Sequence, residues 1–394
     1  MRSITARPTM FHAWPWAIIL CALLSITGAT PAVSASPTYR VGTATPADLG
    51  AAPTPFQAGG YEVWVTNQRR NSIQVVRDEV MAAEIALDGV ARVPHIFRFS
   101  PSGRYAYLAS VGMPGNFRSA NTTVIRVADR SIVAVLPTGP GTHEASPSPD
   151  GERLIVSVGG LKTLAEIVVD EATESFGIGR QLELGTHPLV TAAGLEAQPV
   201  CAHFYAPRKA YVGFHHGGAA LLDVSAFELT RVYSKEEVGP NRCAMLPLPD
   251  GRLLVGAGTE TTGGYAVWDP TTETFVTTID TTQADNHGGA IRPSAAEAWF
   301  VARGSDSLTV VSTETPYGIR EISPFGDAPD HVVFSPDGRW AFVAFRGPEP
   351  LTGGPVAAGR MPGLAIVDAE TRSITRIVDL GGGDPHWVAL RPLP

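Results

Sequence analysis

Residues 93–108 read VPHIFRFSPSGRYAYL. Phe97 and Phe99 alternate along one face of an extended segment, which suits a pleated strand. The Ser-Pro-Ser-Gly stretch at 100–103 then offers the fixed φ of proline and the positive φ that glycine tolerates. We therefore predict a strand, a tight turn over 100–103 and a second strand.

The same unit returns along the chain. Thr142-His143 leads to Ser-Pro-Asp-Gly at 148–151, and Asp330-His331 leads to the same turn at 335–338. Prolines at equivalent first-strand turns lie 42 to 58 residues apart, namely Pro101, Pro149, Pro207, Pro249, Pro293, Pro336 and Pro392. This spacing is close to the ~40–50 residues of β-propeller blades.

The two ends of the chain complement each other. Three strands are predicted before residue 93, over 61–67, 72–77 and 81–87, whereas only one, over 387–390, follows the last complete unit. Together they make one four-stranded sheet, and the closure hides sheet edges that an open array would expose. We predict an all-β fold, a seven-bladed β-propeller over 58–394, closed by pairing the C-terminal strand with the N-terminal blade.

The N-terminus has the pattern of an export signal. Arg2 and Arg7 precede an apolar run over 16–26, and Val-Ser-Ala at 33–35 is a small-residue cleavage site. We predict a signal peptide over 1–35 and a flexible, Ala/Pro/Thr-rich linker over 36–57. The expected location is periplasmic or secreted with no stable membrane anchor, and an uncleaved anchor is the alternative.

Composition narrows the class of partner. Of 394 residues, 44% are hydrophobic and 17% charged, as in a globular protein, and the formal net charge is −8. An acidic surface argues against nucleic acid as the main partner. We expect a monomer that binds a small anionic ligand, or a protein partner at the propeller face.

The repeated segments resemble a known family. Val-Trp-Val-Thr-Asn at 63–67, the Pro-His…Ser-Pro-x-Gly segments and the third strands that close on Asp are similar to the YVTN-type β-propeller repeat family. The resemblance implies relatives that include lactone hydrolases, haem d1 domains and proteins with no known chemistry. The fold therefore does not specify the function.

One repeat position carries chemistry in all seven blades. It lies six residues before each turn proline, near the start of the innermost strand, where seven-fold repetition would form a ring at one channel mouth. The ring members are His95, His143, Cys201, Cys243, His287, Asp330 and His386. Imidazole, thiolate and carboxylate groups are metal ligands. The predicted metal ligands are His143, Cys201, Cys243, His287 and His386.

Alternatives at this ring stay open. The histidines could be structural and bond backbone between blades, and His331 could replace Asp330 as the ring member. Cys201 and Cys243 could form a disulfide, a soft-metal site with nearby histidines, or plain buried thiols.

Loops between second and third strands should open on the same face. Predicted ligand-binding residues there are His215, His216, Arg303 and Arg346, beside His95, His143 and His386, with the arginines clamping an anion. Long segments at 187–200 and 347–360 are predicted to cover this mouth as lids.

Three functions follow. The leading one is binding of a small ligand, a transition metal or a haem d1-like tetrapyrrole at the His/Cys/Asp mouth of an exported propeller. The second is a lactonase-like hydrolase, with His287, Asp330 and His331 as the candidate catalytic residues. The third is a protein-interaction scaffold without catalysis.

Overall fold

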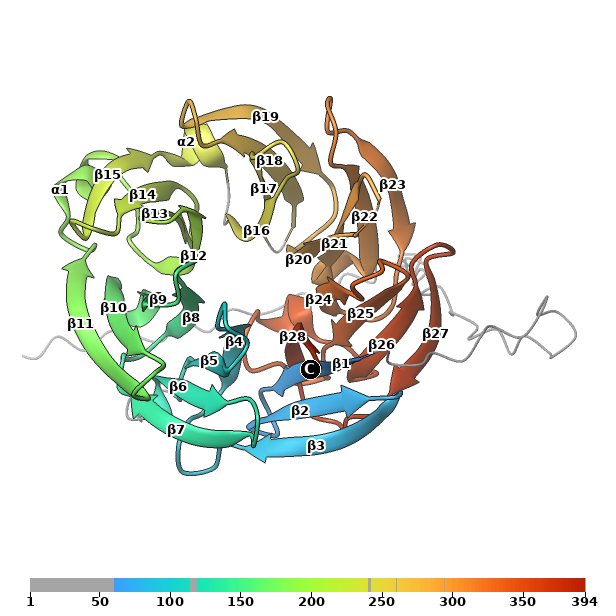
Figure 1. Ribbon diagram of the computed structural model, residues 1–394. Coiled ribbons are helices and arrows are strands. Elements are labelled where there is room, and N and C mark those ends of the chain that lie inside the picture. Colours follow the sequence, from blue (N-terminus) through green and yellow to red (C-terminus); the bar gives the residue numbers. More distant parts are fainter. Residues whose placement is uncertain (1–59, 114–118, 240–241, 260, 294, 394) are drawn as a thin grey trace, which may run out of the picture. The chain divides into compact units, whose positions relative to one another are not determined.

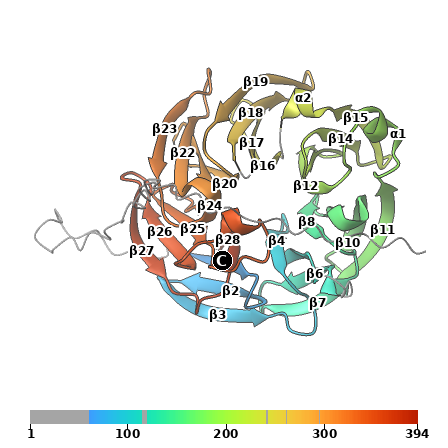
Figure 2. The ribbon, with the colours of Figure 1, turned by 180° about the vertical axis from the view of Figure 1, so that it is seen from behind.

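The computed structural model describes residues 60–113, 119–239, 242–259, 261–293 and 295–393. The predicted signal peptide (1–35) and linker (36–57) lie outside these residues. Within the described part of the chain, the strands form seven four-stranded sheets. The sheets are arranged in a ring like the blades of a propeller (Figure 1), and the reverse view shows the same arrangement (Figure 2). The predicted seven-bladed fold is confirmed.

We number the blades from the N-terminus. Blade 1 contains, in spatial order, β28 (Pro385–Pro392), β1 (Tyr61–Asn67), β2 (Ser72–Arg77) and β3 (Val80–Ala86). Blade 2 contains β4 (Pro94–Phe99), β5 (Tyr105–Ser110), β6 (Asn121–Arg126) and β7 (Ser131–Leu136). Blade 3 contains β8 (Thr142–Pro147), β9 (Arg153–Val158), β10 (Thr163–Asp170) and β11 (Ser175–Glu183). Blade 4 contains β12 (Pro199–Ala206), β13 (Lys209–Phe214), β14 (Ala219–Asp223) and β15 (Glu228–Tyr233).

The remaining blades follow the same scheme. Blade 5 contains β16 (Arg242–Pro247), β17 (Leu253–Gly258), β18 (Gly263–Asp269) and β19 (Thr274–Thr281). Blade 6 contains β20 (Asn286–Ile291), β21 (Glu297–Ala302), β22 (Ser307–Ser312) and β23 (Ile319–Pro324). Blade 7 contains β24 (Pro329–Phe334), β25 (Trp340–Phe345), β26 (Gly363–Asp368) and β27 (Ser373–Val378). The first strand of each of blades 2 to 7, and β28 of blade 1, is innermost (Figure 1).

The ring closes through the two ends of the chain. Strand β28 pairs antiparallel with β1, with Val388 opposite Val65 and Leu390 opposite Val63. Figure 1 shows β28 lying beside β1 on the inner side of the ring. This arrangement confirms the predicted closure, which leaves no blade with an unpaired inner strand among the described residues.

The Pro-containing turns form as the sequence predicts. The glycines of four of these turns have φ values of +70° to +86°, namely Gly103, Gly151, Gly251 and Gly338. Each donates its N–H to the carbonyl three residues earlier, at 2.8 to 3.0 Å. Other residues rarely adopt this φ, so the repeated glycine allows the tight reversal between the first two strands of four blades.

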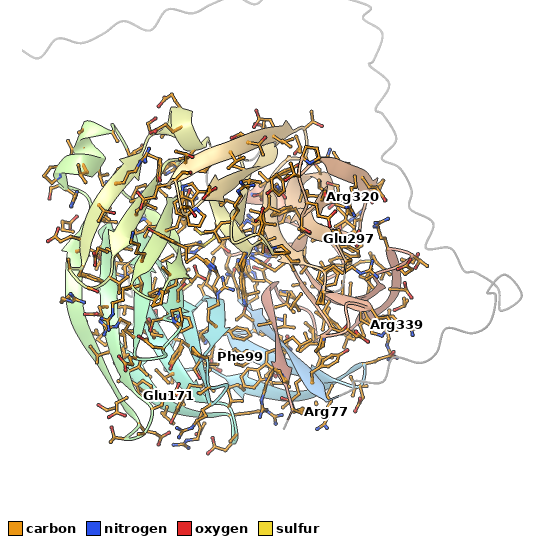
Figure 3. All side chains as sticks on the ribbon, turned by 45° about the horizontal axis from the view of Figure 1, so that its top comes forward. Arg77, Phe99, Glu171, Glu297, Arg320 and Arg339 are labelled. Atoms are coloured by element: carbon orange, nitrogen blue, oxygen red, sulfur yellow. A yellow bond between two sulfur atoms is a disulfide. The ribbon has the colours of Figure 1, made fainter. Side chains whose placement is uncertain are left out.

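Side chains from neighbouring blades pack against one another to form the core. Trp64 of blade 1 is fully buried and lies edge-on to Phe99 of blade 2, with ring centroids 5.3 Å apart. Figure 3 shows side chains filling the spaces between the sheets, with Phe99 labelled. Alternating residues on each strand thus contribute to two interfaces, which explains why so many strands are buried on both faces.

Helices are few and short. Among the described residues, α1 (Pro188–Ala192) lies in one predicted lid and α2 (Lys235–Val238) precedes blade 5. Neither could have been detected by helical periodicity, because each spans little more than one turn. The described helices also include none with the length and apolar character needed to cross a membrane.

Candidate functional site

A backbone irregularity marks the ring position in every blade. The pairing of each innermost strand with its neighbour shifts register at this position or beside it. In blade 6, for example, Asn286 pairs with Ala302 and Gly288 pairs with Val301, so His287 is skipped. A bulge of this kind re-aims a side chain out of the regular pleat. We infer that the bulges turn the ring residues toward the common axis.

The four ring histidines line a cavity of about 750 Å³ at the predicted mouth. The same cavity is bounded by His215 and His216 and by glycine-rich loops that follow second strands. Both predicted lids contribute to its wall, through Gln198 to Val200 and through Thr352 to Gly354. The four ring histidines thus converge, as the repeat spacing predicts. Only the end of the first long segment, at Gln198 to Val200, reaches the cavity, because helix α1 lies beside β15 on the outer side of blade 4 (Figure 1). A lid over the mouth therefore stays a prediction. This volume is typical of pockets for small ligands.

The ring histidines touch one another across blade boundaries. The ring centroid of His95 lies 4.2 Å from that of His143 and 4.0 Å from that of His386. The rings of His287 and His386 are 6.0 Å apart. The chain thus brings imidazoles that are up to 291 residues apart in sequence, at His95 and His386, into direct contact.

Burial keeps these imidazoles neutral. Together with a smaller effect of the nearby His215, it lowers the pKa of His143 to about 3. Burial also lowers the pKa values of His95, His287 and His386 well below the ordinary value of 6.5, with neighbouring histidines or arginines adding to the effect. Neutral imidazole is the form that binds a metal ion.

Asp330 is the anionic centre beneath the cavity. Its side chain is fully buried, and burial alone would raise its pKa, but the guanidinium groups of Arg303 and Arg346 hold the pKa well below the usual range. Arg346 Nη1 donates to Asp330 Oδ2 at 2.6 Å, and Arg303 Nη1 lies 3.4 Å from the same oxygen. The second oxygen, Oδ1, lies 2.9 Å from His331 Nδ1 and 3.4 Å from His287 Nε2.

Two further carboxylates complete this network, and the sequence analysis missed both. Asp384 accepts from Arg346 Nε and Nη2, each at 2.7 Å, and Asp285 accepts from Arg303 Nε at 2.7 Å. A signal was present in the sequence, because each Asp stands two residues before a ring histidine, in Asp285-Asn-His287 and Asp384-Pro-His386. Three formal negative charges face two positive ones, so the network favours a cation over an anion in the cavity above it.

The two arginines predicted to bind an anion are paired with carboxylates. Arg346 is fully buried and uses its guanidinium on Asp330, Asp384 and Gln68. Arg303 borders the cavity, but its guanidinium is directed to two carboxylates. These buried partners neutralise both charges and so disfavour an anion clamp, which stays a prediction.

Three possible ligand atoms meet at this network. Atoms of His287, Asp330 and His386 all lie within 4.8 Å of one another. Neither ring nitrogen of the buried His386 has a hydrogen-bond partner among the described residues. Burying a polar atom without a partner is unfavourable, so such atoms indicate an interaction partner that the protein chain does not supply.

The register question at blade 7 is resolved. Asp330 is the second residue of its inner strand, as His287 and His386 are of theirs, so Asp330 is the ring member. His331 follows it, and its ring lies 4.1 Å from that of Trp387. Neither Asp330 nor His331 is among the residues that line the cavity.

Cys201 and Cys243 form a disulfide between the inner strands of blades 4 and 5, with Cα atoms 5.3 Å apart. Of the three predicted states, this one is observed. A bridged sulfur is not a thiolate, so the predicted ligand role of Cys201 and Cys243 is corrected for the oxidised protein. His143 Nδ1 lies 3.9 Å from Cys201 Sγ.

His215 and His216 line the same cavity. His215 Nδ1 is 3.2 Å from His216 Nε2, which in turn is 3.3 Å from a carboxylate oxygen of Glu196 in the first lid. Burial lowers the pKa of His215, and His216 lowers it further. The pair is thus held by a lid contact and borders the path to the ring histidines.

The lowered pKa values of two histidines, His143 on β8 and His203 on β12, predict that stability depends on pH. Their pKa values are about 3 for His143 and about 4 for His203 in the folded protein, against about 6.5 unfolded. The unfolded chain therefore binds more protons below pH 6.5, and stability present above that pH is lost as pH falls toward these folded values.

We expect urea unfolding of the protein to show that the free energy of unfolding falls by at least about 1 kcal/mol per pH unit between pH 6.5 and 4.5. His143→Asn should reduce this slope, and a pH-independent midpoint in this range would contradict the assignment.

Comparisons with known proteins find similar structures but no family to which the chain can be assigned. No protein-family model matches the chain, and no curated protein matches it. A solved structure of "Kuenenia stuttgartiensis Hydrazine Synthase" is similar with a TM-score of 0.54 at 14% identity, covering 76% of this chain and 86% of that one. A structure of "Dihydro-heme d1 dehydrogenase NirN in complex with DHE" has a TM-score of 0.53 at 15% identity, covering 87% of this chain and 78% of that one. At this identity the likeness shows the fold alone, and the resemblance to the YVTN-type family stays a prediction.

Proposed function

We propose that this protein is an extracytoplasmic metal-binding propeller. Its metal centre is formed by His287, Asp330 and His386, from blades 6, 7 and 1. The observation that carries the proposal is the meeting of two neutral imidazoles and one ionised carboxylate beneath the cavity, with ligand atoms within 4.8 Å of one another.

This ligand set favours particular metals. Two histidines and one carboxylate on one side of a metal leave positions open, an arrangement that suits Fe²⁺ and related divalent first-row ions. Arg346 and Arg303 hold Oδ2 of Asp330 and leave Oδ1 directed toward the imidazoles. The open positions would face the cavity, because His287 and His386 line it.

The structural alternative for the histidines is less well supported. It requires that the ring histidines bond the backbone between blades, as His143 does at Val200 of blade 4. His386 has no hydrogen-bond partner on either nitrogen, and His95 has none on Nδ1, among the described residues. A purely structural histidine would be expected to satisfy these buried atoms.

A tetrapyrrole is a second candidate ligand. One solved structure with this fold is a complex with DHE, in a protein described as a dihydro-haem d1 dehydrogenase. The cavity of about 750 Å³ could hold a flat macrocycle, and His95 or His143 would offer an axial nitrogen. In both candidates a histidine coordinates a metal. In the tetrapyrrole the metal is held by the macrocycle, whereas in the first candidate it is bound by protein side chains alone.

A hydrolase is supported less. The predicted catalytic residues Asp330 and His331 do not line the cavity, and two arginines hold the pKa of Asp330 low. A carboxylate held in this way is a weak general base. The scaffold function remains compatible with the fold but leaves the unpartnered imidazoles unexplained.

The disulfide supports an extracytoplasmic location. Disulfides persist in oxidising compartments, and the bridge between blades 4 and 5 accords with the predicted signal peptide. Export is thus part of the proposal.

Metal titration tests the centre. Oxidised, chelator-treated protein should bind one Fe²⁺ or Co²⁺ per chain, and His287→Ala or His386→Ala should weaken binding at least about 100-fold. His216→Ala, a histidine at the same cavity but outside the three ligands, is the matched control and should bind normally.

Parallel titration with haemin separates the two ligands. Saturable binding of haemin with a ligand-field spectrum that changes in His95→Ala or His143→Ala would favour the tetrapyrrole. Equal metal affinity in wild type and His386→Ala, together with no response to haemin, would refute the proposed function.

A further inference from the structure

Cys201, Cys243 and His143 form a second group of potential ligand atoms. Their sulfur and nitrogen atoms all lie within 4.8 Å of one another, on the inner strands of blades 4, 5 and 3 respectively. We propose that reduction of the Cys201–Cys243 disulfide converts this corner of the cavity into a soft-metal site, with two thiolates and His143 as ligands. The inference does not depend on the centre at His287, Asp330 and His386, which uses different residues.

The backbone already has the spacing of such a site. The two Cα atoms are 5.3 Å apart. In a tetrahedral zinc site with Zn–S bonds of about 2.3 Å, two thiolate sulfurs are about 3.8 Å apart. Rotation of the two side chains about their Cα–Cβ bonds can provide this separation, because the sulfurs project from neighbouring strands whose backbones stay in place.

His143 is in position to be the third ligand. Its Nδ1 lies 3.9 Å from Cys201 Sγ, and a sulfur and a nitrogen on the same tetrahedral zinc are about 3.5 Å apart. His143 also makes a hydrogen bond to the backbone of Val200, the residue before Cys201. A backbone contact of this kind fixes the orientation of a metal-bound imidazole.

The site would be open on one side. His143 and Val200 line the cavity, so a fourth position is accessible to a small molecule or water. Two thiolates and one imidazole select soft or borderline ions such as Cu⁺ and Zn²⁺ over Mg²⁺ or Ca²⁺. The chemistry thus differs from that of the histidine–carboxylate centre across the cavity.

The redox step balances with a dithiol reductant. The reductant supplies two electrons and two protons, the S–S bond breaks, and the reductant becomes a disulfide while Cys201 and Cys243 become thiols. Metal binding then releases two protons from the thiols. The fold has another closure, the pairing of β28 with β1, and therefore does not need the bridge to complete the ring.

Cobalt is the probe that reports thiolate coordination. The full chain with Cys21→Ser, which leaves only Cys201 and Cys243, is treated with a dithiol under anaerobic conditions, desalted and titrated with Co²⁺. We expect a saturable thiolate-to-cobalt charge-transfer band in the reduced protein and no such band in the oxidised protein. His143→Ala should weaken this binding at least about tenfold, and Cys243→Ser should abolish the band.

Two controls keep the result specific. His386→Ala, which removes a ligand of the other centre, should leave the band unchanged, so that failure of the proposed function and failure of this inference are separable. Circular dichroism of the reduced protein should match that of the oxidised protein. The inference is overturned if reduction unfolds the chain, if the reduced protein shows no thiolate band, or if His143→Ala binds Co²⁺ as wild type does.

Discussion

Deletion of residues 385–394, which removes strand β28, is expected to abolish cooperative folding of the propeller. The strand supplies the innermost position of blade 1 and pairs with β1 along its length. It also places Val388 in a core cluster with side chains of blade 7, such as Trp340 and Leu364. Without it, β1 becomes an exposed edge and the ring is open. We expect a chain that lacks a single thermal transition and aggregates.

A shorter truncation is the matched control. Removal of residues 393–394 alone keeps all of β28 and should leave the unfolding midpoint within a few degrees of wild type. Calorimetry and denaturant unfolding of both variants decide the matter. A cooperative transition of near-native midpoint in the 385–394 deletion would mean that closure by the chain ends is not required for stability.

Replacement of Arg346 by Met is expected to destabilise the fold by about 3–5 kcal/mol. The guanidinium is fully buried, and it is the shared partner of Asp330 and Asp384. Burial lowers the pKa of Arg346, but the two carboxylates more than offset this effect and raise it above its ordinary value. Its loss would leave two buried carboxylates with too few positive partners, which is costlier than losing the pair altogether.

Arg339→Met is the control in the same blade. Arg339 is exposed and lies over the ring of Trp340 at 5.4 Å, so its replacement should change stability by less than about 1 kcal/mol. Urea unfolding near pH 7 compares the two variants directly. If Arg346→Met were as stable as Arg339→Met, the buried network could not be the main support of Asp330. The Arg346 variant should also bind metal more weakly, because the orientation of Asp330 depends on it.

The architecture followed from the sequence because propeller blades repeat. The repeat is visible in the turn prolines, the turn glycines and the Asp residues that end third strands. Each of these residues meets a local backbone requirement, and such requirements act within a few residues. Asp223, for example, accepts a hydrogen bond from the N–H of Ser225, as the turn interpretation predicts. Counting these local signals gave seven blades, and the missing strand at one end matched the extra strand at the other.

The ring was also predictable, because symmetry brings equivalent positions to a common axis. The convergence of His95, His143, His287 and His386 required only the repeat spacing and the position of the inner strand. The bulges that orient these side chains are not visible in the sequence, but the repeat carries them in all seven blades.

Which side chains form ion pairs, and whether the two cysteines are bridged, was decided by the tertiary structure. The repeat places Arg303 and Arg346 near the mouth, but only three-dimensional packing shows that buried carboxylates of the same and of neighbouring blades pair with both. Likewise, the distance between Cys201 and Cys243 depends on how blades 4 and 5 meet, and that contact links residues 42 positions apart. Local sequence specifies each strand and turn because short-range backbone conformation governs them. Charge pairing, the disulfide and the cavity depend on distances between blades, which no single segment of the chain determines.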